Sequence, residues 1–308
     1  MILITEFMDE AAVETLKGNF EIVYNPALAD HQDDIPAMME NVRALIVRNR
    51  TRVTDELLSN APQLSCIGRL GVGLDNIDVV TCERRGVSIY PATGANNVSV
   101  AEYVVTAALT LLRGAWYSKH AMLAGEWPRR ACVGREIGDK SLGLIGFGAI
   151  ARDTARLAQG LGMKILAHDP FVNENDSGLS GVNLMSFDEV LEQSDVISLH
   201  VPLAADTWHL IDGEAISRMK PHAILINAAR GGVVDEKALS ATLKSGRLAG
   251  AALDVFETEP LTAEAAKRFS GIPNLILTPH IAGVTEESNV RVSSMIAETV
   301  LKHLQEKR

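Results

Sequence analysis

Residues 142–151 read Leu-Gly-Leu-Ile-Gly-Phe-Gly-Ala-Ile-Ala, an apolar run that passes through closely spaced glycines into a helix-like segment. The Gly146-x-Gly148-x-x-Ala151 pattern is typical of a strand–turn–helix unit that binds a dinucleotide. Gly146 permits a tight turn, Gly148 lets the backbone approach a pyrophosphate, and Ala151 is small enough for close helix–strand packing. The pyrophosphate would lie on the amides at the helix N-terminus, where the helix dipole favours an anion.

An acidic residue follows at the spacing that ribose recognition requires. The run Lys164–Asp169 reads as the next strand, and Asp169 lies 21 residues beyond Gly148. In such units an acid at about this distance binds the ribose hydroxyls, and its charge repels a 2′-phosphate. No Lys or Arg occurs in residues 170–173. The alternative for Asp169 is a turn residue before Pro170, but the spacing favours ribose binding and predicts NAD rather than NADP.

The same alternation of short apolar runs and helix-like segments extends through the chain. Uniformly apolar runs are typical of parallel strands covered on both faces, so the pattern predicts an α/β fold built on parallel sheets. The runs are Ile2–Thr5, Ala44–Val47, Ser65–Gly68, Leu142–Gly148, Lys164–Asp169, Asp195–Pro202, Ala223–Ala229, Leu248–Phe256 and Leu275–His280. A long helix is expected over residues 98–123 and another over 286–307. At roughly 150 residues per domain, 308 residues predict two domains.

Composition excludes several classes of function. The chain has 29 Lys and Arg against 39 Asp and Glu, which argues against a nucleic-acid-binding face. Cys66, Cys82 and Cys132 are too few and too scattered for a disulfide framework or a metal site, which predicts a cytoplasmic setting and no metal. The N-terminus lacks a basic region, and the longest apolar stretch, residues 98–112, is too short to cross a bilayer.

Three further motifs place reactive side chains directly after apolar runs. Arg230 lies in Ile226–Glu236, Glu259 in Leu253–Pro260 and His280 in Thr278–Gly283. Because ligands bind at the carboxyl edge of a parallel sheet, all three are expected at one site. Taken singly, each could be an ordinary surface or turn residue.

With the Arg69–Asp78 segment, these motifs make the whole chain resemble the D-isomer-specific 2-hydroxy acid dehydrogenase family, which includes phosphoglycerate, glycerate and D-lactate dehydrogenases. The resemblance implies two doubly wound parallel-sheet domains with a cleft between them. A flavodoxin-like substrate domain would comprise residues 1–97 plus 287–308. A Rossmann NAD-binding domain would comprise residues 98–286.

The resemblance also implies roles for individual residues. Asp254 would contact the nicotinamide carboxamide, and the Val72 and Gly73 amides would receive the substrate carboxylate. The further residues expected to bind the cofactor are Ala149, Ile150, Val201, Ala228 and Gly283.

The chemistry of keto-acid reduction fits the three motif residues. Arg230 is planar and always charged, so it can bridge the substrate carboxylate and the polarised carbonyl oxygen. His280 can give a proton to the developing alkoxide and take it back in the oxidative direction. Glu259, hydrogen-bonded to His280, would orient the ring and favour its protonated form. The family pattern places the acid directly before Pro260, so Glu257 is expected to be dispensable.

Arginines gather at the predicted strand ends of the first domain. Arg48, Arg50 and Arg52 follow one apolar run and Arg69 follows another. Arg48 and Arg69 resemble positions that face the substrate's phosphate in phosphoglycerate dehydrogenases, whereas Arg50 and Arg52 are equally well explained as solvated loop charge. A substrate with a second anionic group is therefore predicted.

The identity of that substrate stays open between three candidates. Residues 4–10 and the arginine-rich loop are similar to bacterial family members assigned to (S)-sulfolactate and 3-sulfopyruvate, and 3-phosphoglycerate and glycerate/hydroxypyruvate are the alternatives. Another class, an NAD-sensing binding protein on the same scaffold, is disfavoured by the intact Arg230, Glu259 and His280. Formate dehydrogenase pairs its His with Gln, so Glu259 disfavours it. By resemblance we expect a homodimer formed through residues 98–124.

Overall fold

The computed structural model describes residues 1–173 and 175–307 and divides the chain into two compact units. Unit 1 comprises Met1–Asn96 and Val284–Arg308, and unit 2 comprises Asn97–Gly283. The boundaries expected from the sequence, after residues 97 and 286, lie slightly further along the chain. Two parallel-sheet α/β units confirm the predicted fold class.

Unit 1 is built on a five-stranded parallel sheet. The strands are β1 (Ile2–Ile4), β2 (Ile22–Tyr24), β3 (Ala44–Val47), β4 (Cys66–Arg69) and β5 (Ser88–Pro91). Their spatial order, β2-β1-β3-β4-β5, is that of a flavodoxin-like sheet. In this order the topological switch point lies between β1 and β3, so ligands are expected beyond the carboxyl ends of those two strands.

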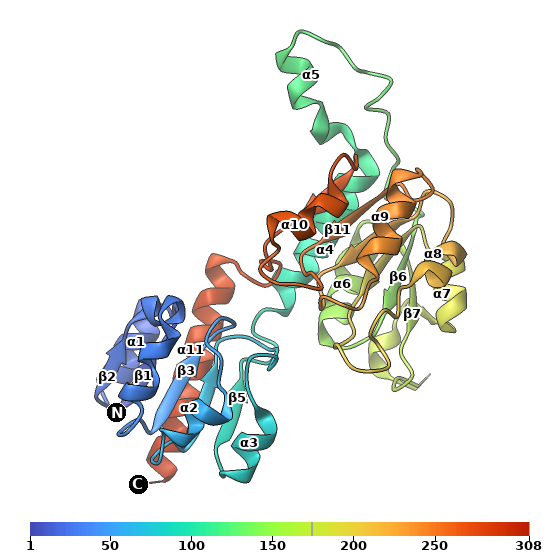
Figure 1. The fold of residues 1–308 in the computed structure, drawn as a ribbon. Helices are drawn as coiled ribbons and strands as arrows, with labels where there is room; N and C mark the ends of the chain where they lie inside the picture. The colour runs from blue at the N-terminus through green and yellow to red at the C-terminus, as the bar shows by residue number, and fades with distance from the viewer. Residues whose placement is uncertain (174, 308) are drawn as a thin grey trace. The chain divides into compact units, whose positions relative to one another are not determined.

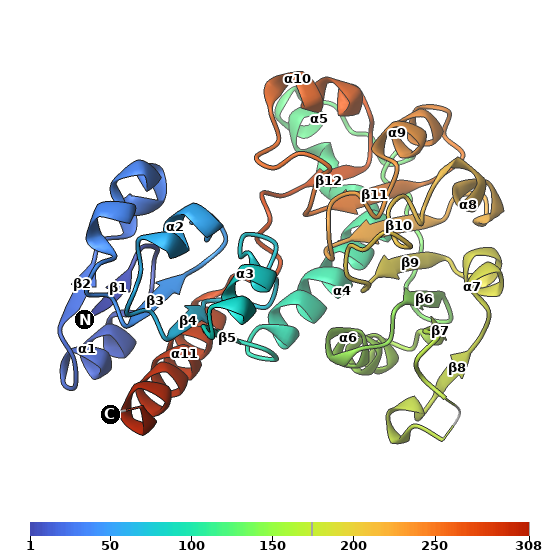
Figure 2. The ribbon, with the colours of Figure 1, turned by 60° about the horizontal axis from the view of Figure 1, so that its bottom comes forward.

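Helices cover both faces of this sheet, as Figures 1 and 2 show. α1 (Glu10–Lys17) and α11 (Glu286–Glu306) pack into one apolar cluster. The other cluster includes side chains of α2 (Asp55–Ser59), α3 (Val79–Arg84), η1 (Pro26–Asp30) and η3 (Pro36–Met38). The short η2 (Gln32–Asp34) between η1 and η3 buries no side chain. α11 approaches β4 closely, because a Cβ at Gly68 would lie 2.6 Å from the side chain of Ile296.

Unit 2 is built on a seven-stranded parallel sheet. The strands are β6 (Ser141–Ile145), β7 (Lys164–His168), β8 (Val182–Leu184), β9 (Val196–Leu199), β10 (Ile224–Asn227), β11 (Gly250–Leu253) and β12 (Leu275–Leu277). The order β12-β11-β10-β9-β6-β7-β8 is the Rossmann order with one more strand at the edge. Each of the six apolar runs after residue 140 contains a strand. The sequence analysis did not anticipate β8 of this sheet, nor β2 and β5 of unit 1.

The helices of unit 2 also form two layers (Figure 2). α4 (Asn97–Arg113) and α6 (Ala149–Gly160) pack on one face. The other face carries α7 (Phe187–Gln193), α8 (Gly213–Arg218) and α9 (Glu236–Lys244). The short elements are η4 (Ala115–Ser118), α5 (Lys119–Leu123), η5 (Ser177–Leu179), α10 (Ala263–Ala266) and η6 (Lys267–Phe269).

The single helix expected over residues 98–123 is wrong. α4 ends at Arg113, and Gly114 adopts φ +60°, a left-handed conformation that breaks the helix and that glycine tolerates. The chain continues through η4 and α5 at 63° to α4. Among the described residues no single helix is long and apolar enough to cross a membrane, and this bent pair passes on length and composition only.

The buried cysteines of unit 1 are structural. Cys66 in β4 and Cys82 in α3 have no exposed surface, and burial raises the pKa of each thiol to about 11. Such thiols stay protonated near neutral pH and are poor nucleophiles.

Candidate active site

The glycine-rich turn lies at the topological switch point of unit 2, where β6 and β9 are neighbours. Gly146 has φ +88°, and a Cβ there would lie 2.7 Å from the His200 carbonyl oxygen. A side chain at this position would therefore clash with the backbone that follows β9, so the turn requires glycine. Burial lowers the pKa of His200 to about 4, so this ring is neutral and structural.

The residues after this turn fit a dinucleotide. Gly148 precedes α6, no side chain caps the N-terminus of this helix, and a Cβ at Gly148 would meet nothing within 4 Å. The unused helix amides and the open space beside Gly148 are what a pyrophosphate requires. Ala149 and Ile150 form the first residues of α6, as the sequence predicts.

Asp169 lies immediately beside this turn. Its Oδ2 accepts a hydrogen bond from the Phe147 amide at 2.7 Å, and its Oδ1 accepts one from the Phe171 amide at 2.9 Å. These bonds fix the carboxylate just beyond β7 and leave acceptor capacity on both oxygens for ribose hydroxyls.

Sequence reasoning missed a cation near Asp169. Arg152 of α6 lies with its guanidinium 4.9 Å from the Phe147 ring centroid, and the Asp169 charge helps to raise its pKa, after the hydrogen bond to Asp176. Asp176 binds both terminal nitrogens of Arg152, at 2.6 and 2.9 Å. Because Asp176 already pairs with this guanidinium, Arg152 is not expected to attract the 2′-phosphate of NADP, and the preference for NAD stands.

Arg230 lies in the loop that follows β10. The Asn227 side chain donates to the Arg230 carbonyl oxygen at 2.9 Å and accepts from the Ala229 amide at 3.1 Å. The Arg230 guanidinium donates to the Ala229 carbonyl oxygen at 2.7 Å. Asn227 thus fixes the turn that carries the arginine, together with the predicted cofactor residue Ala228.

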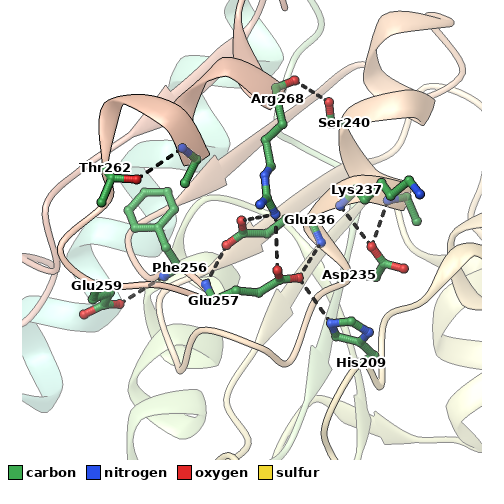
Figure 3. A network of polar contacts seen from close by, with 12 residues as sticks. His209, Asp235, Glu236, Lys237, Ser240, Phe256, Glu257, Glu259, Thr262 and Arg268 are labelled. Atoms are coloured by element: carbon green, nitrogen blue, oxygen red, sulfur yellow. Dashed lines mark hydrogen bonds and ion pairs between the residues drawn. The ribbon is translucent and has the colours of Figure 1, made fainter.

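Glu259 and His280 meet from two different loops of unit 2. His280 Nδ1 lies 2.7 Å from Glu259 Oε2, and Glu259 Oε1 accepts from the Phe256 amide at 3.0 Å, a contact drawn in Figure 3. Burial opposes ionisation of Glu259, but the His280 and Phe256 hydrogen bonds and the charges of His280 and Arg230 outweigh it and lower its pKa. With Nδ1 facing a carboxylate, Nε2 is the ring atom suited to proton exchange with a substrate.

Asp254 fixes the loop that carries His280. It is 1% exposed, and its carboxylate accepts from the Ile281 and Ala282 amides, each at 2.8 Å. The Thr278 hydroxyl donates to it at 2.6 Å. Asp254 is therefore held inside the unit, and the predicted contact with a nicotinamide carboxamide stays a prediction. Gly283, another predicted cofactor residue, closes the same loop, and Val201 follows β9 beside Gly146.

The predicted substrate residues lie in unit 1, two of them at its switch point or next to it. Arg48 follows β3, and burial, opposed by the charge of Glu6, lowers the pKa of its guanidinium. Its Nη2 donates to Asn289 Oδ1 of α11 at 2.8 Å. The side-chain partner is a neutral amide, so no carboxylate is bonded to this guanidinium in the contacts described, and the nearby charge of Glu6 only partly offsets its burial. Sequence reasoning missed Asn289, because it lies 241 residues away.

Glu6 organises the Arg48 loop from the end of β1. Its carboxylate is 4% exposed and accepts from the backbone amides of Arg48 at 2.8 Å, Arg50 at 3.1 Å and Thr51 at 2.9 Å. This role of Glu6 could not be predicted from residues 4–10, because the amides that it binds lie more than 40 residues away in the sequence.

Arg69 ends β4, and its Nη1 donates to the Leu70 carbonyl oxygen at 3.0 Å. Gly71 has φ +152°, a backbone conformation that residues with a side chain rarely adopt, and a Cβ there would also displace the Arg69 guanidinium, because it would lie 1.8 Å from the same nitrogen. Val72 and Gly73 follow directly and are half-buried.

Arg50 is directed to another partner. It forms an exposed ion pair with Asp30, and the Arg52 amide donates to Gln32. Arg50 therefore serves as a comparison for Arg48 within one loop.

Within residues 1–173 and 175–307, no group of three or more His, Cys, Asp or Glu side chains could hold a metal ion.

Comparison with known proteins agrees with this geometry. A family model described as D-isomer specific 2-hydroxyacid dehydrogenase, NAD binding domain, matches residues 105–282. The (S)-sulfolactate dehydrogenase of Chromohalobacter salexigens is 53% identical over 304 residues, which cover 98% of each chain. The D-3-phosphoglycerate dehydrogenase of Synechocystis is 34% identical over 97% of this chain, which spans about half (53%) of that relative's length.

A solved structure of D-lactate dehydrogenase from Aquifex aeolicus, complexed with NAD and lactic acid, has a TM-score of 0.85 to this chain. The two sequences are 30% identical, and the match covers 99% of this chain and 96% of that one.

Proposed function

The chain belongs to the D-isomer-specific 2-hydroxyacid dehydrogenase family, and we propose that it interconverts (S)-sulfolactate and 3-sulfopyruvate with NAD. The observation that carries the reaction type is the Glu259–His280 pair in the unit that also holds Arg230 and the glycine-rich turn. The observation that favours the substrate is the 53% identity to the Chromohalobacter salexigens protein over nearly the whole chain.

In this proposal each side chain has one task. NAD, when bound, supplies or accepts the hydride. Arg230 binds the substrate carboxylate and stabilises negative charge on the carbonyl oxygen. His280 holds, at Nε2, the proton that this oxygen takes up on reduction, and Glu259 orients the ring through Nδ1. The Val72 and Gly73 amides receive the carboxylate as well.

The Arg48 and Arg69 side chains bind the second anion. The buried charge of Arg48, with its neutral partner Asn289, supports this role. D-specificity agrees with the (S) label, because sulfur outranks the carboxylate in the priority rules and a D-like sulfolactate is therefore named (S).

The test is NADH-dependent reduction of 3-sulfopyruvate, 3-phosphohydroxypyruvate, hydroxypyruvate and pyruvate, with Arg48→Ala and its matched control Arg50→Ala. We expect 3-sulfopyruvate to give the highest kcat/KM. A charge-assisted contact contributes about 1.5–3 kcal/mol. Arg48→Ala should therefore lower kcat/KM for both dianions by roughly 10- to 150-fold, at about 1.4 kcal/mol per decade. Arg69→Ala should act similarly, whereas Arg50→Ala should not.

Pyruvate, which has a methyl group in place of the second anion, should be a poor substrate and barely affected by Arg48→Ala. Equal losses on pyruvate and 3-sulfopyruvate would make the arginine structural or assign it to the shared carboxylate. A plain aliphatic keto acid as the best substrate would refute the dianion proposal. Preference for 3-phosphohydroxypyruvate or hydroxypyruvate would select one of the alternative substrates. NADH binding without any turnover would favour an NAD-sensing protein.

We further propose a homodimer in a reducing, cytoplasmic setting. The segment 114–136 extends from α4 (Figure 1) and carries strongly exposed apolar side chains. Trp116, Leu123 and Trp127 are 70–76% exposed, which is unusual for an unpartnered surface. Light scattering should give a mass near 66 kDa, twice the 33.2 kDa of the chain, and Leu123→Asp should shift it toward the monomer. A monomeric wild type would refute the dimer.

A further inference from the structure

We propose that Glu257 is a positioning residue: with Glu236, Arg268 and His209 it forms a clamp that holds the Glu259 and Arg230 loops in their reactive arrangement. The inference rests on the proposed function, since it assigns a task within that site. Figure 3 shows the clamp, in which side chains from α9, η6 and the loops after β9 and β11 converge.

The centre of the clamp is a reciprocal lock between two glutamates. Glu257 Oε1 accepts from the Glu236 amide at 3.2 Å, and Glu236 Oε1 accepts from the Glu257 amide at 2.7 Å. The Glu236 side chain is only 4% exposed. Burial, opposed by the hydrogen bond from the Glu257 amide, raises the pKa of Glu236. This lock ties the loop after β11 to the N-terminus of α9.

Two basic side chains complete the clamp. Arg268 Nη1 lies 3.0 Å from Glu236 Oε2 and 3.2 Å from Glu257 Oε2, so one guanidinium nitrogen bridges both carboxylates and offsets part of their mutual repulsion. His209 Nε2 lies 3.1 Å from Glu257 Oε1. The Arg268 carbonyl oxygen accepts from Ser240 of α9, which fixes the backbone that carries the guanidinium.

The clamp reaches Glu259 through one short segment of backbone. Phe256 precedes Glu257, and its amide donates to Glu259 Oε1 at 3.0 Å. The other oxygen of Glu259 faces His280 at 2.7 Å. Displacement of Glu257 therefore moves the amide that orients Glu259, and through it the imidazole.

The clamp also reaches the loop of Arg230. A Cβ at Gly231 would lie 1.8 Å from the Phe256 carbonyl oxygen, so the two loops touch backbone to backbone. On the other side, the His209 amide donates to the Gly232 carbonyl oxygen at 2.7 Å. The Trp208 ring stacks on His209 and lies where a Gly232 side chain would be. The Arg230 turn therefore contacts the clamp on two sides. Phe256, the residue before Glu257, lies against Gly231, and His209, which pairs with Glu257, binds Gly232.

This arrangement replaces the expectation that Glu257 is dispensable. Glutamine at 257 would keep an acceptor for the Glu236 amide but would lose the charge that holds Arg268 and His209. Alanine would lose all of these contacts. Glu257→Gln should therefore lower kcat less than Glu257→Ala. Both variants should lower kcat by displacing the Glu259 and Arg230 loops.

The test compares Glu257→Ala and Glu257→Gln with Glu264→Gln, a change at an exposed glutamate of α10 that forms an ion pair with Lys267. Small displacements of reacting groups cost up to about 100-fold, so we expect kcat for Glu257→Ala to fall by roughly 10- to 100-fold. The kcat of Glu257→Gln should fall less than that of Glu257→Ala, and the kcat of Glu264→Gln should match that of the wild type. KM for NADH should change by less than about twofold, since the clamp does not touch the glycine-rich turn.

The pH dependence separates positioning from mere stability. If the Glu259 carboxylate moves from His280, the protonated ring loses its partner, and reduction should decline at lower pH than in the wild type. Folded Glu257→Ala with wild-type kcat and an unchanged pH profile, measured well below its Tm, would overturn the proposal even if Tm fell. If Glu257→Ala does not fold, the half-buried Arg268→Met gives the same readouts and the same refutation.

Failure of the clamp and failure of the proposed function give different results. A wild type inactive on every keto acid, or a fully active His280→Ala, would refute the proposed function. Wild-type turnover with no kcat or pH effect at position 257 would refute only the clamp.

Discussion

Replacement of Glu6 by glutamine tests whether one buried carboxylate shapes the loop that presents Arg48. Glu6 lies beyond β1 and Arg48 beyond β3, at the switch point of the unit 1 sheet. The carboxylate accepts from the three loop amides, mostly through Oε1. Glutamine can keep a carbonyl oxygen at the Oε1 position, but its amide nitrogen cannot accept from the Arg50 amide.

The magnitude follows from the number and kind of these bonds. A hydrogen bond to a charged group contributes about 1.5–3 kcal/mol and a neutral one about 0.5–1.5 kcal/mol. The substitution should therefore cost about 1 kcal/mol per bond, or about 3 kcal/mol for the loop. At about 1.4 kcal/mol per decade, this makes local opening of the loop roughly 100-fold more frequent.

Hydrogen exchange of the amides of residues 48–51 measures that opening directly. We expect exchange up to about 100-fold faster in Glu6→Gln and unchanged in Glu21→Gln, an exposed glutamate of the same unit. KM for 3-sulfopyruvate should rise and turnover of pyruvate should stay within a few-fold. Wild-type exchange rates in folded Glu6→Gln would refute the structural reasoning. Faster exchange with unchanged KM would refute only the link to the second anion.

Three predictions concern the catalytic and cofactor residues. His280→Ala should lower kcat by roughly two to four orders of magnitude while NADH binding, measured by fluorescence, survives. The lowered pKa of Glu259 means that its carboxylate is ionised at neutral pH and that its stabilising effect is lost only as the pH falls through that lowered value. Glu259→Gln should therefore remove a negative charge that is present at neutral pH, and the rate of reduction should begin to decline at a lower pH on the alkaline side. An unchanged pH profile would refute the role of the Glu259–His280 pair. The wild type should prefer NADH over NADPH in kcat/KM, and Asp169→Ala should narrow this preference mainly through KM for NADH. Equal use of NADPH by the wild type would refute the role of Asp169.

The sequence predicts those features that depend on local pattern. Each apolar run after residue 140 contains a strand, and Gly146 takes the left-handed conformation that its motif requires. Arg230, Glu259 and His280 fall in loops after strands because a parallel sheet places the end of every strand at one edge. The failure at Gly114 is also local. The apolar periodicity continues through it, but a single left-handed residue is enough to end α4.

Features that depend on a distant partner could not be predicted in this way. Asn289 reaches Arg48 across 241 residues, and Asp176 reaches Arg152 across 24 residues. A charged residue in a sequence has many possible partners, and only the packing of the sheet selects one. The sequence therefore indicated which side chains are reactive but did not indicate which side chains hold them in place.

Glu257 and Glu259 show this difference within a single loop. Both residues are glutamates, and in the sequence only the family pattern, which places the catalytic acid directly before Pro260, identifies Glu259 as the partner of His280. In the structure their separation by two residues turns one carboxylate toward His280 and the other toward Glu236 and Arg268. The first carboxylate faces the His280 ring, whereas the second is held by the Glu236 amide, Arg268 and His209. A loop that must present one carboxylate at a defined angle needs an anchor, and the neighbouring acid supplies it because a partly buried charge with several hydrogen-bond partners has few favourable positions.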